Sequence, residues 1–143
     1  MSRISRTELF FEVALTMAKR STCNRAKVGC VVVKDNRIIA TGYNGALPND
    51  SHCNSLDCND TKPCSNTIHA EMNAISYAAK KGIALDKSIL YSTHLPCPIC
   101  AKLIVQAGIT SVYYIHAYRD ISGLHLLINQ GIECFPIAKI SHD

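Results

Sequence analysis

The sequence predicts an α/β fold with three layers, α/β/α, around one five-stranded mixed sheet. In the second half of the chain, short β-branched runs alternate with helical segments, and this alternation requires crossover connections that make the strands mostly parallel. In the first half, two β-branched runs flank a short polar segment, which is typical of a leading antiparallel hairpin. The chain has 143 residues without an internal repeat or a change in composition, so we expect a single domain, 1–143.

The N-terminal segment predicts an amphipathic helix. Ser5 and Glu8 form a capping-box pattern, in which each residue satisfies a backbone N–H of the other at the start of a helix. Leu9, Val13 and Met17 follow at helical spacing. We therefore expect a helix that begins after Ser5 and ends near Arg20.

The hairpin and a long loop come next. Residues 28–33 and 38–41 are predicted strands, and residues 34–37 supply turn chemistry between them. Residues 44–67 carry Gly, Pro, Asn, Asp and Ser with little periodicity, so they are expected to form a loop. A loop of this length in a small domain needs an anchor.

The rest of the chain predicts three helices and three strands. The helices are expected at 69–81, 97–107 and 122–130, each followed by a glycine that can adopt the left-handed conformation of a helix end (Gly82, Gly108 and Gly131). The strands are expected at 88–93, 111–116 and 132–137.

Composition limits the class of protein. A hydrophobic content of 48% with 18% charged residues is ordinary for a soluble globular protein, and no apolar run reaches the roughly 18 residues of a membrane span. The N-terminus has no signal-peptide pattern, so we expect a cytoplasmic protein, or one in the host cytosol if it is viral. Eight cysteines in a reducing compartment favour metal binding over disulfides. A net charge of +4 suits an anionic small molecule, but no basic block indicates nucleic-acid binding.

Two motifs carry the candidate chemistry: His69-Ala70-Glu71 at the start of one predicted helix and Pro96-Cys97-Pro98-Ile99-Cys100 at the start of the next. Cysteines at i and i+3 share a helix face, and a helix N-terminus favours thiolates. His69, Cys97 and Cys100 would give zinc three protein ligands and leave the fourth position for water. This pattern is typical of a catalytic zinc site.

Glu71 is the expected general acid and base. Two residues after His69, its carboxylate can reach a zinc-activated water, take its proton and deliver that proton to a ring nitrogen and then to departing ammonia. Taken alone, the CxxC could be a redox pair, and the HxE could be incidental. Together and in this order they match the signature of zinc nucleobase deaminases, which attack C4 of cytosine or C6 of adenine.

With these motifs in view, the chain resembles the cytidine deaminase superfamily, and most of all its deoxycytidylate (dCMP) deaminase branch. The resemblance runs from about Leu9 to Ile137 and implies a cytidine-deaminase-like fold. It also implies hydrolysis of dCMP to dUMP and ammonia, which supplies dUMP for thymidylate synthesis. The segments that carry it are Lys27-Val28-Gly29, Gly42-Tyr43-Asn44-Gly45, Thr67 to Ile75, and Thr93 to Cys100.

The resemblance also implies substrate-binding roles. Asn44 would hydrogen-bond the nucleotide, the backbone N–H of Ala70 would meet the pyrimidine carbonyl, and Tyr118 would line the base and ribose pocket. Arg25 and Lys27 are candidates for the 5′-phosphate, where a guanidinium can bind in bidentate fashion. The alternatives are an ordinary half-buried tyrosine and a solvated basic turn.

Members of this branch are often hexameric, and we expect a homo-oligomer, hexamer or dimer. They are often activated by dCTP and inhibited by dTTP, with Mg²⁺ accompanying the triphosphate. The corresponding effector residues here are Gly42, Tyr43 and Gly45, although a plain turn would also use these glycines.

A second, structural zinc is implied by the resemblance to viral and bacterial members of the branch. Its expected thiolate ligands are Cys23, Cys53, Cys58 and Cys64, with His52 as an alternative ligand. This zinc would anchor the loop insertion at about 46–66 and gives two zinc ions per chain. Free loop thiols are the alternative.

Cys30 and Cys134 lie in predicted strands and are expected to be small buried apolar residues.

Two other functions fit parts of the pattern. A tRNA adenosine deaminase or another nucleobase deaminase would share the zinc chemistry, but an RNA-binding face needs basic and aromatic side chains, and this chain has no Trp and a modest charge. A non-enzymatic, zinc-stabilised binding module would have no use for Glu71 beside an open zinc position.

Overall fold

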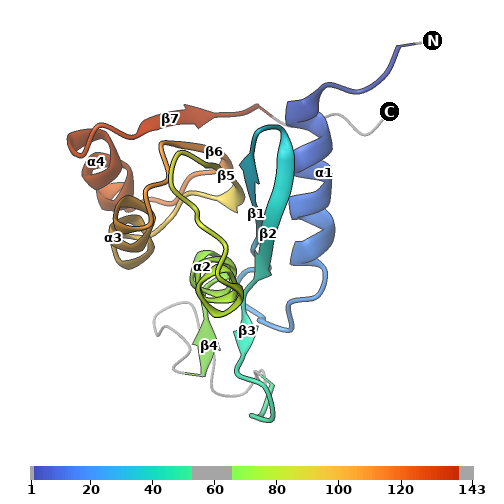
Figure 1. Cartoon of the computed structure of the whole chain (residues 1–143). Helices are drawn as coiled ribbons and strands as arrows, with labels where there is room; N and C mark the ends of the chain where they lie inside the picture. The colour runs from blue at the N-terminus through green and yellow to red at the C-terminus, as the bar shows by residue number, and fades with distance from the viewer. Residues whose placement is uncertain (1, 53–65, 139–143) are drawn as a thin grey trace.

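The computed structural model describes residues 2–52 and 66–138. Within them, the five-stranded sheet has the order β2-β1-β5-β6-β7 (Figure 1). β1 is antiparallel to both β2 and β5, whereas β5, β6 and β7 are parallel, so the predicted mixed sheet with a leading hairpin is confirmed. The strands are β1 (Gly29–Lys34), β2 (Arg37–Tyr43), β5 (Ile89–His94), β6 (Ser111–His116) and β7 (Glu133–Pro136).

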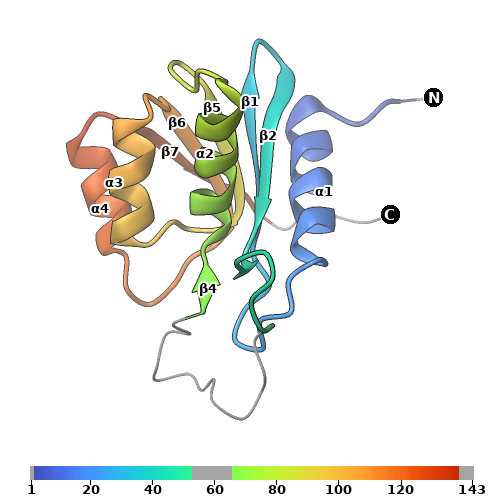
Figure 2. The same ribbon diagram turned by 60° about the horizontal axis from the view of Figure 1, so that its bottom comes forward.

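Helices cover the sheet on both faces, which confirms the three layers (Figures 1 and 2). One face carries α1 (Arg6–Ala18), which packs on β1, β2 and β5. The other carries α2 (Ala70–Lys81), α3 (Pro98–Gln106) and α4 (Ser122–Asn129). None of the helices in the described part of the chain is long and apolar enough to cross a membrane.

The pleat of β1 divides the interior into two cores. Val31 and Val33 pack with α1 in one cluster, whereas Val32 and Leu90 pack beneath α2, α3 and α4 in the other. β1 is therefore buried on both faces. This double burial explains why its sequence is a continuous apolar run rather than an alternating one.

The expected helix ends are present. Ser5 and Glu8 form the capping box, with N–H to side-chain distances of 3.0 and 3.1 Å. The three glycines after α2, α3 and α4 have φ values of 69°, 84° and 80°. α1 ends at Ala18, two residues before the predicted end at Arg20.

The hairpin turn has positive φ at both central residues, Asp35 (52°) and Asn36 (62°). This conformation matches the right-handed twist of paired strands, and Asn and Asp tolerate it better than most residues. β2 extends to Tyr43, two residues beyond the predicted strand.

A second, small sheet lies inside the segment that was predicted to be a loop. β3 (Gly45–Ala46) pairs antiparallel with β4 (Thr67–Ile68), which brings the two ends of that segment together. Asn44 directly precedes β3 and His69 directly follows β4, so the pairing of Gly45 with Ile68 brings these two residues close together. Of the expected structural zinc ligands, Cys53, Cys58 and Cys64 lie outside the described residues.

Candidate active site

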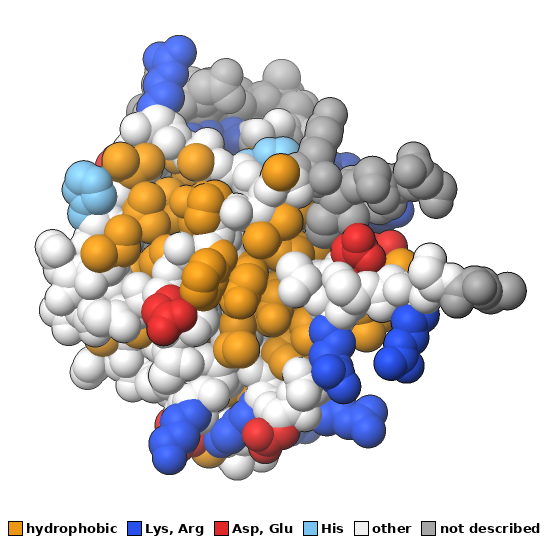
Figure 3. All heavy atoms as spheres, turned by 90° about the horizontal axis from the view of Figure 1, so that it is seen from above, with side chains coloured by type: hydrophobic (Ala, Val, Ile, Leu, Met, Phe, Trp, Pro, Cys, Tyr) orange, Lys and Arg blue, Asp and Glu red, His pale blue; other side chains and the backbone are white. Residues whose placement is uncertain are grey.

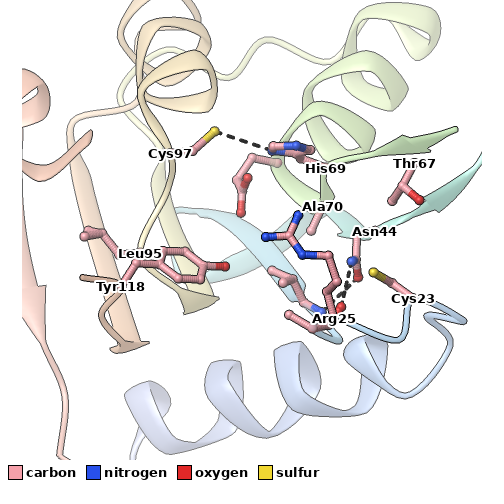
Figure 4. Close-up of a pocket in the computed structure, with 12 residues that line it drawn as sticks. Cys23, Arg25, Asn44, Thr67, His69, Ala70, Leu95, Cys97 and Tyr118 are labelled. Carbon is pink, nitrogen blue, oxygen red and sulfur yellow. Dashed lines mark hydrogen bonds between the residues drawn. The ribbon is translucent and has the colours of Figure 1, made fainter. Parts of the chain in front are cut away.

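Two helix N-termini bring the predicted zinc ligands together. His69 is the N-cap of α2, Cys97 is the N-cap of α3, and Cys100 lies in the first turn of α3. Neither N-cap side chain bonds its own helix, so both are available to turn into the site. His69 Nδ1 lies 3.5 Å from Cys97 Sγ (Figure 4). It lies 3.3 Å from Cys100 Sγ.

The donor set fits zinc. The three candidate ligand atoms lie within 4.8 Å of one another. Zinc binds nitrogen and sulfur at about 2.0–2.3 Å, and in a tetrahedron such ligands lie about 3.5–3.8 Å apart. In the described part of the chain, no fourth His, Cys, Asp or Glu joins this group. The arrangement therefore suits a zinc ion with one position open to a small molecule.

Cys97 is primed to bind as a thiolate. A hydrogen bond from the Cys100 thiol is the main reason that the pKa of Cys97 is lowered to about 4, and His69 contributes in the same direction. The hydrogen bond with Cys97 in turn raises the pKa of His69. Because zinc binds thiolate rather than thiol, a cysteine ionised at neutral pH favours metal binding.

Glu71 lies in the first turn of α2 and is only 4% exposed. Burial is the main cause of a raised pKa for this carboxyl group. The Ser92 hydroxyl, on β5, donates to Glu71 Oε1 at 3.4 Å. A raised pKa means that this carboxyl group holds a proton more readily than an exposed one, which suits a group that must accept a proton and return it.

A pocket with a volume of about 330 Å³ opens beside these residues. This volume is at the lower end of the range for small-molecule sites. Arg25 and Tyr118 point into the pocket from opposite sides (Figure 4). Burial raises the pKa of Tyr118 to about 12, so its phenol stays neutral and keeps its hydrogen-bond donor.

The two candidate phosphate-binding residues, Arg25 and Lys27, differ in their position relative to the pocket. Both side chains are exposed, but Arg25 lines the pocket, as do Ala26 and Val28, whereas Lys27 does not. Arg25 is therefore the better placed of the two cations to meet a ligand.

Asn44 lines the pocket and is buried. Its Oδ1 accepts from the Val28 N–H at 2.9 Å, and its Nδ2 donates to the Ala26 carbonyl at 2.9 Å. The side chain therefore holds the loop that carries Arg25, and the amide retains one further N–H for a ligand.

The predicted effector glycines differ in their surroundings. A Cβ on Gly42 would overlap the Ala70 carbonyl and lie 2.9 Å from the Ala74 nitrogen, so close packing of β2 on α2 already requires a glycine there. A Cβ on Gly45 would meet only the Tyr43 ring, at an ordinary 3.5 Å. Packing accounts for Gly42 without an effector.

Of the predicted ligands of the second zinc, Cys23 and His52 lie within the described residues. Cys23 is buried and lines the pocket, and His52 is exposed. Cys30 is fully buried in β1, as expected, whereas Cys134 in β7 is only partly buried because it lies near the edge of the sheet.

Sequence reasoning assigned no role to Ser92, Thr93 or His94, although the last two lie in a segment that carried the resemblance. Ser92 contacts Glu71, and the Thr93 hydroxyl accepts from the Gly29 N–H at 3.1 Å. These contacts depend on which strand lies beside β5 and which helix packs over it. No local sequence signal specifies either neighbour.

The sequence matches the family model for the cytidine and deoxycytidylate deaminase zinc-binding region over residues 4–116. The chain belongs to the cytidine and deoxycytidylate deaminase family. The matched region contains His69, Glu71, Cys97 and Cys100.

Relatives and solved structures agree with this family. ComE operon protein 2 of Bacillus subtilis is 45% identical over 120 residues, which cover 83% of this chain and 64% of the relative. The deoxycytidylate deaminase of Schizosaccharomyces pombe is 38% identical over 87% of this chain and 41% of its own length. The chain thus spans less than two thirds of either relative. The crystal structure of dCMP deaminase from cyanophage S-TIM5 in complex with dCMP and dUMP has a TM-score of 0.86 and 35% identity, covering 96% of this chain and 100% of that chain.

Proposed function

We propose that this protein is a zinc-dependent hydrolytic deaminase that converts dCMP and water to dUMP and ammonia. The observation that carries the proposal is the His69, Cys97 and Cys100 cluster, with buried Glu71 beside it in one pocket. The cyanophage dCMP deaminase, whose structure holds dCMP and dUMP, is covered over its whole length by 96% of this chain. This match supports dCMP as the substrate.

In the proposed site, His69, Cys97 and Cys100 would hold zinc, which would supply Lewis-acid activation of water. Glu71 would take a proton from the attacking water and pass it to N3 of the cytosine ring as the C4–O bond forms. Glu71 then moves the second proton to the exocyclic nitrogen, the C4–N bond breaks, and ammonia leaves. No oxidant or further reactant is required.

The pocket walls supply the proposed substrate contacts. Ala70 is the first residue of α2, and the first N–H groups of a helix have no partner within it, so its N–H is available to the pyrimidine carbonyl. Asn44 and Tyr118 would contact the sugar and base. Arg25 would bind the 5′-phosphate, and the exposed Lys27 would add long-range attraction.

Three finer features of the family are proposals for this chain as well. The first is a single catalytic domain over 1–143, located in the cytoplasm. The second is activation by dCTP and inhibition by dTTP, with Mg²⁺, through residues 42–45.

The third is a structural zinc bound by Cys23, Cys53, Cys58 and Cys64. Metal analysis should then give two zinc ions per chain, and replacing Cys58 and Cys64 should remove one of them. A single ion that survives this replacement would contradict the second site.

A homo-oligomer is supported by apolar surface. On the α1 side, the sheet continues beyond the helix, and Tyr113 and Phe135 stack with centroids 4.7 Å apart while remaining partly exposed. Figure 3 shows apolar side chains gathered on one face of the molecule. Contiguous patches of this kind are common at protein interfaces. Light scattering of the purified chain tests for a dimer or hexamer.

A deamination screen tests the proposed function. Ammonia release is measured with dCMP, CMP, dCTP, deoxycytidine and adenosine-containing tRNA anticodon stem-loops. We expect turnover of dCMP and much weaker turnover of deoxycytidine, which has no 5′-phosphate for Arg25 to contact. Turnover of the RNA without turnover of dCMP would replace the proposal with an RNA deaminase, and no turnover of any substrate would favour a binding module.

A further inference from the structure

Three rings contact one another beside the pocket. His94 ends β5, and its ring stacks on Tyr118 with centroids 5.6 Å apart and an interplanar angle of 24°. The His94 ring also contacts His116 of β6, its register partner, in a tilted pair with centroids 4.9 Å apart. Tyr118 lines the pocket, whereas neither histidine does.

His94 is held firmly by the sheet. The Thr93 hydroxyl lies 2.8 Å from His94 Nδ1, and its oxygen accepts from the Gly29 N–H of β1. The hydroxyl proton of a residue only 1% exposed needs an acceptor, and Nδ1 supplies it. With the hydroxyl as donor, His94 is neutral with its proton on Nε2, and the contact ties its ring to the two central strands.

Tyr118 has much weaker support of its own. It lies in the segment between β6 and α4 and is 43% exposed. Its ring nevertheless forms the pocket wall opposite Arg25 (Figure 4). The stack on His94 is the ring contact that joins this exposed side chain to the rigid sheet.

We propose that His94 is a positioning residue that holds the Tyr118 ring against the bound nucleotide. It acts on substrate binding through Tyr118 and does not touch the reacting atoms. The inference rests on the proposed function only in taking a pyrimidine nucleotide as the ligand.

A double-mutant cycle tests this role. Wild type, His94→Leu, Tyr118→Leu and the double variant are compared by kcat and KM for dCMP and by calorimetric binding of dUMP. Aromatic pairs contribute enough that we expect His94→Leu to weaken dUMP binding and raise KM about three- to tenfold, with kcat changed less than about twofold. In the Tyr118→Leu background, His94→Leu should have almost no further effect, because the ring that it positions is gone.

Two further variants separate positioning from folding. His94→Phe keeps a flat ring for Tyr118 and should return KM to within about twofold of wild type. His125→Leu removes an exposed histidine on α4 and should leave KM unchanged. The proposal is overturned by additive effects in the cycle, by a loss confined to kcat, or by failure of His94→Phe to restore binding. If wild type binds dUMP without deaminating dCMP, the proposed function fails, and the cycle is decided from the dissociation constants alone.

Discussion

At the scale of single residues, the proposed reaction depends on a proton carried by Glu71. Replacing it with Gln keeps the shape of the side chain and its contact with Ser92 but removes the basic oxygen. We expect Glu71→Gln to lower kcat for dCMP by at least about 10²–10⁴-fold while zinc content stays at the wild-type level. Ammonia release and metal analysis on the same preparation measure both effects.

The matched control for this prediction is Glu133→Gln, which removes an exposed carboxylate at the start of β7. Its activity should equal that of wild type. A Glu71→Gln protein that retained wild-type turnover would rule out the proposed path of the proton.

The metal ligands give a second prediction at this scale. Cys100→Ala should lose about one zinc ion per chain together with all measurable deamination, because it removes one of three donors from the cluster. Cys134→Ala changes a partly buried thiol that is not part of this cluster, so it should keep both zinc and activity. Unchanged zinc content in Cys100→Ala would place the ion elsewhere.

At the scale of elements, the packing of β2 on α2 positions the first turn that carries His69 and Glu71. A methyl group on Gly42 would overlap the Ala70 carbonyl, so strand or helix must shift. We expect Gly42→Ala to lower the free energy of unfolding by about 1–3 kcal/mol and to reduce kcat. Urea unfolding and dCMP kinetics measure the two effects.

Gly45→Ala is the natural comparison, because its Cβ would make only an ordinary contact with Tyr43. Its stability should stay within about 0.5 kcal/mol of wild type. If the two alanine variants were equally stable, close packing could not be the reason for glycine at 42.

The sequence predicted those elements whose apolar residues recur at regular spacing or whose ends carry a cap or a glycine. The four helices and the five main strands show apolar periodicity, caps or glycine stops, and the paired motifs at 69–71 and 96–100 lie at helix starts. The β3–β4 pair was missed because strands of two residues contain no alternation to detect. The contact of Thr93 with Gly29 follows from the placement of β5 beside β1, and that of Ser92 with Glu71 follows from the packing of α2 over β5, so neither could be foreseen.

At the scale of the whole molecule, His94 couples stability to pH. Burial is the main reason that the pKa of His94 is lowered to about 4, and the neighbouring His116 adds to the effect. Between that value and the ordinary value of about 6.5, the unfolded chain carries a proton on this residue that the folded chain lacks. The free energy of unfolding contributed by His94 is therefore complete above about pH 6.5 and is lost as the pH falls toward 4.

His94→Phe removes this titration and keeps the ring. Urea unfolding of wild type and variant at pH 7.5 and pH 5 should give a smaller loss of stability for the variant on acidification, although both proteins share the protonation of the zinc ligands. Subtracting the two pH dependences isolates His94 together with its coupling to His116, because the other titrating groups are common to both chains. Equal losses in the two proteins would mean that folding does not lower the pKa of His94. The contact with Thr93 would then not hold the imidazole in its neutral form.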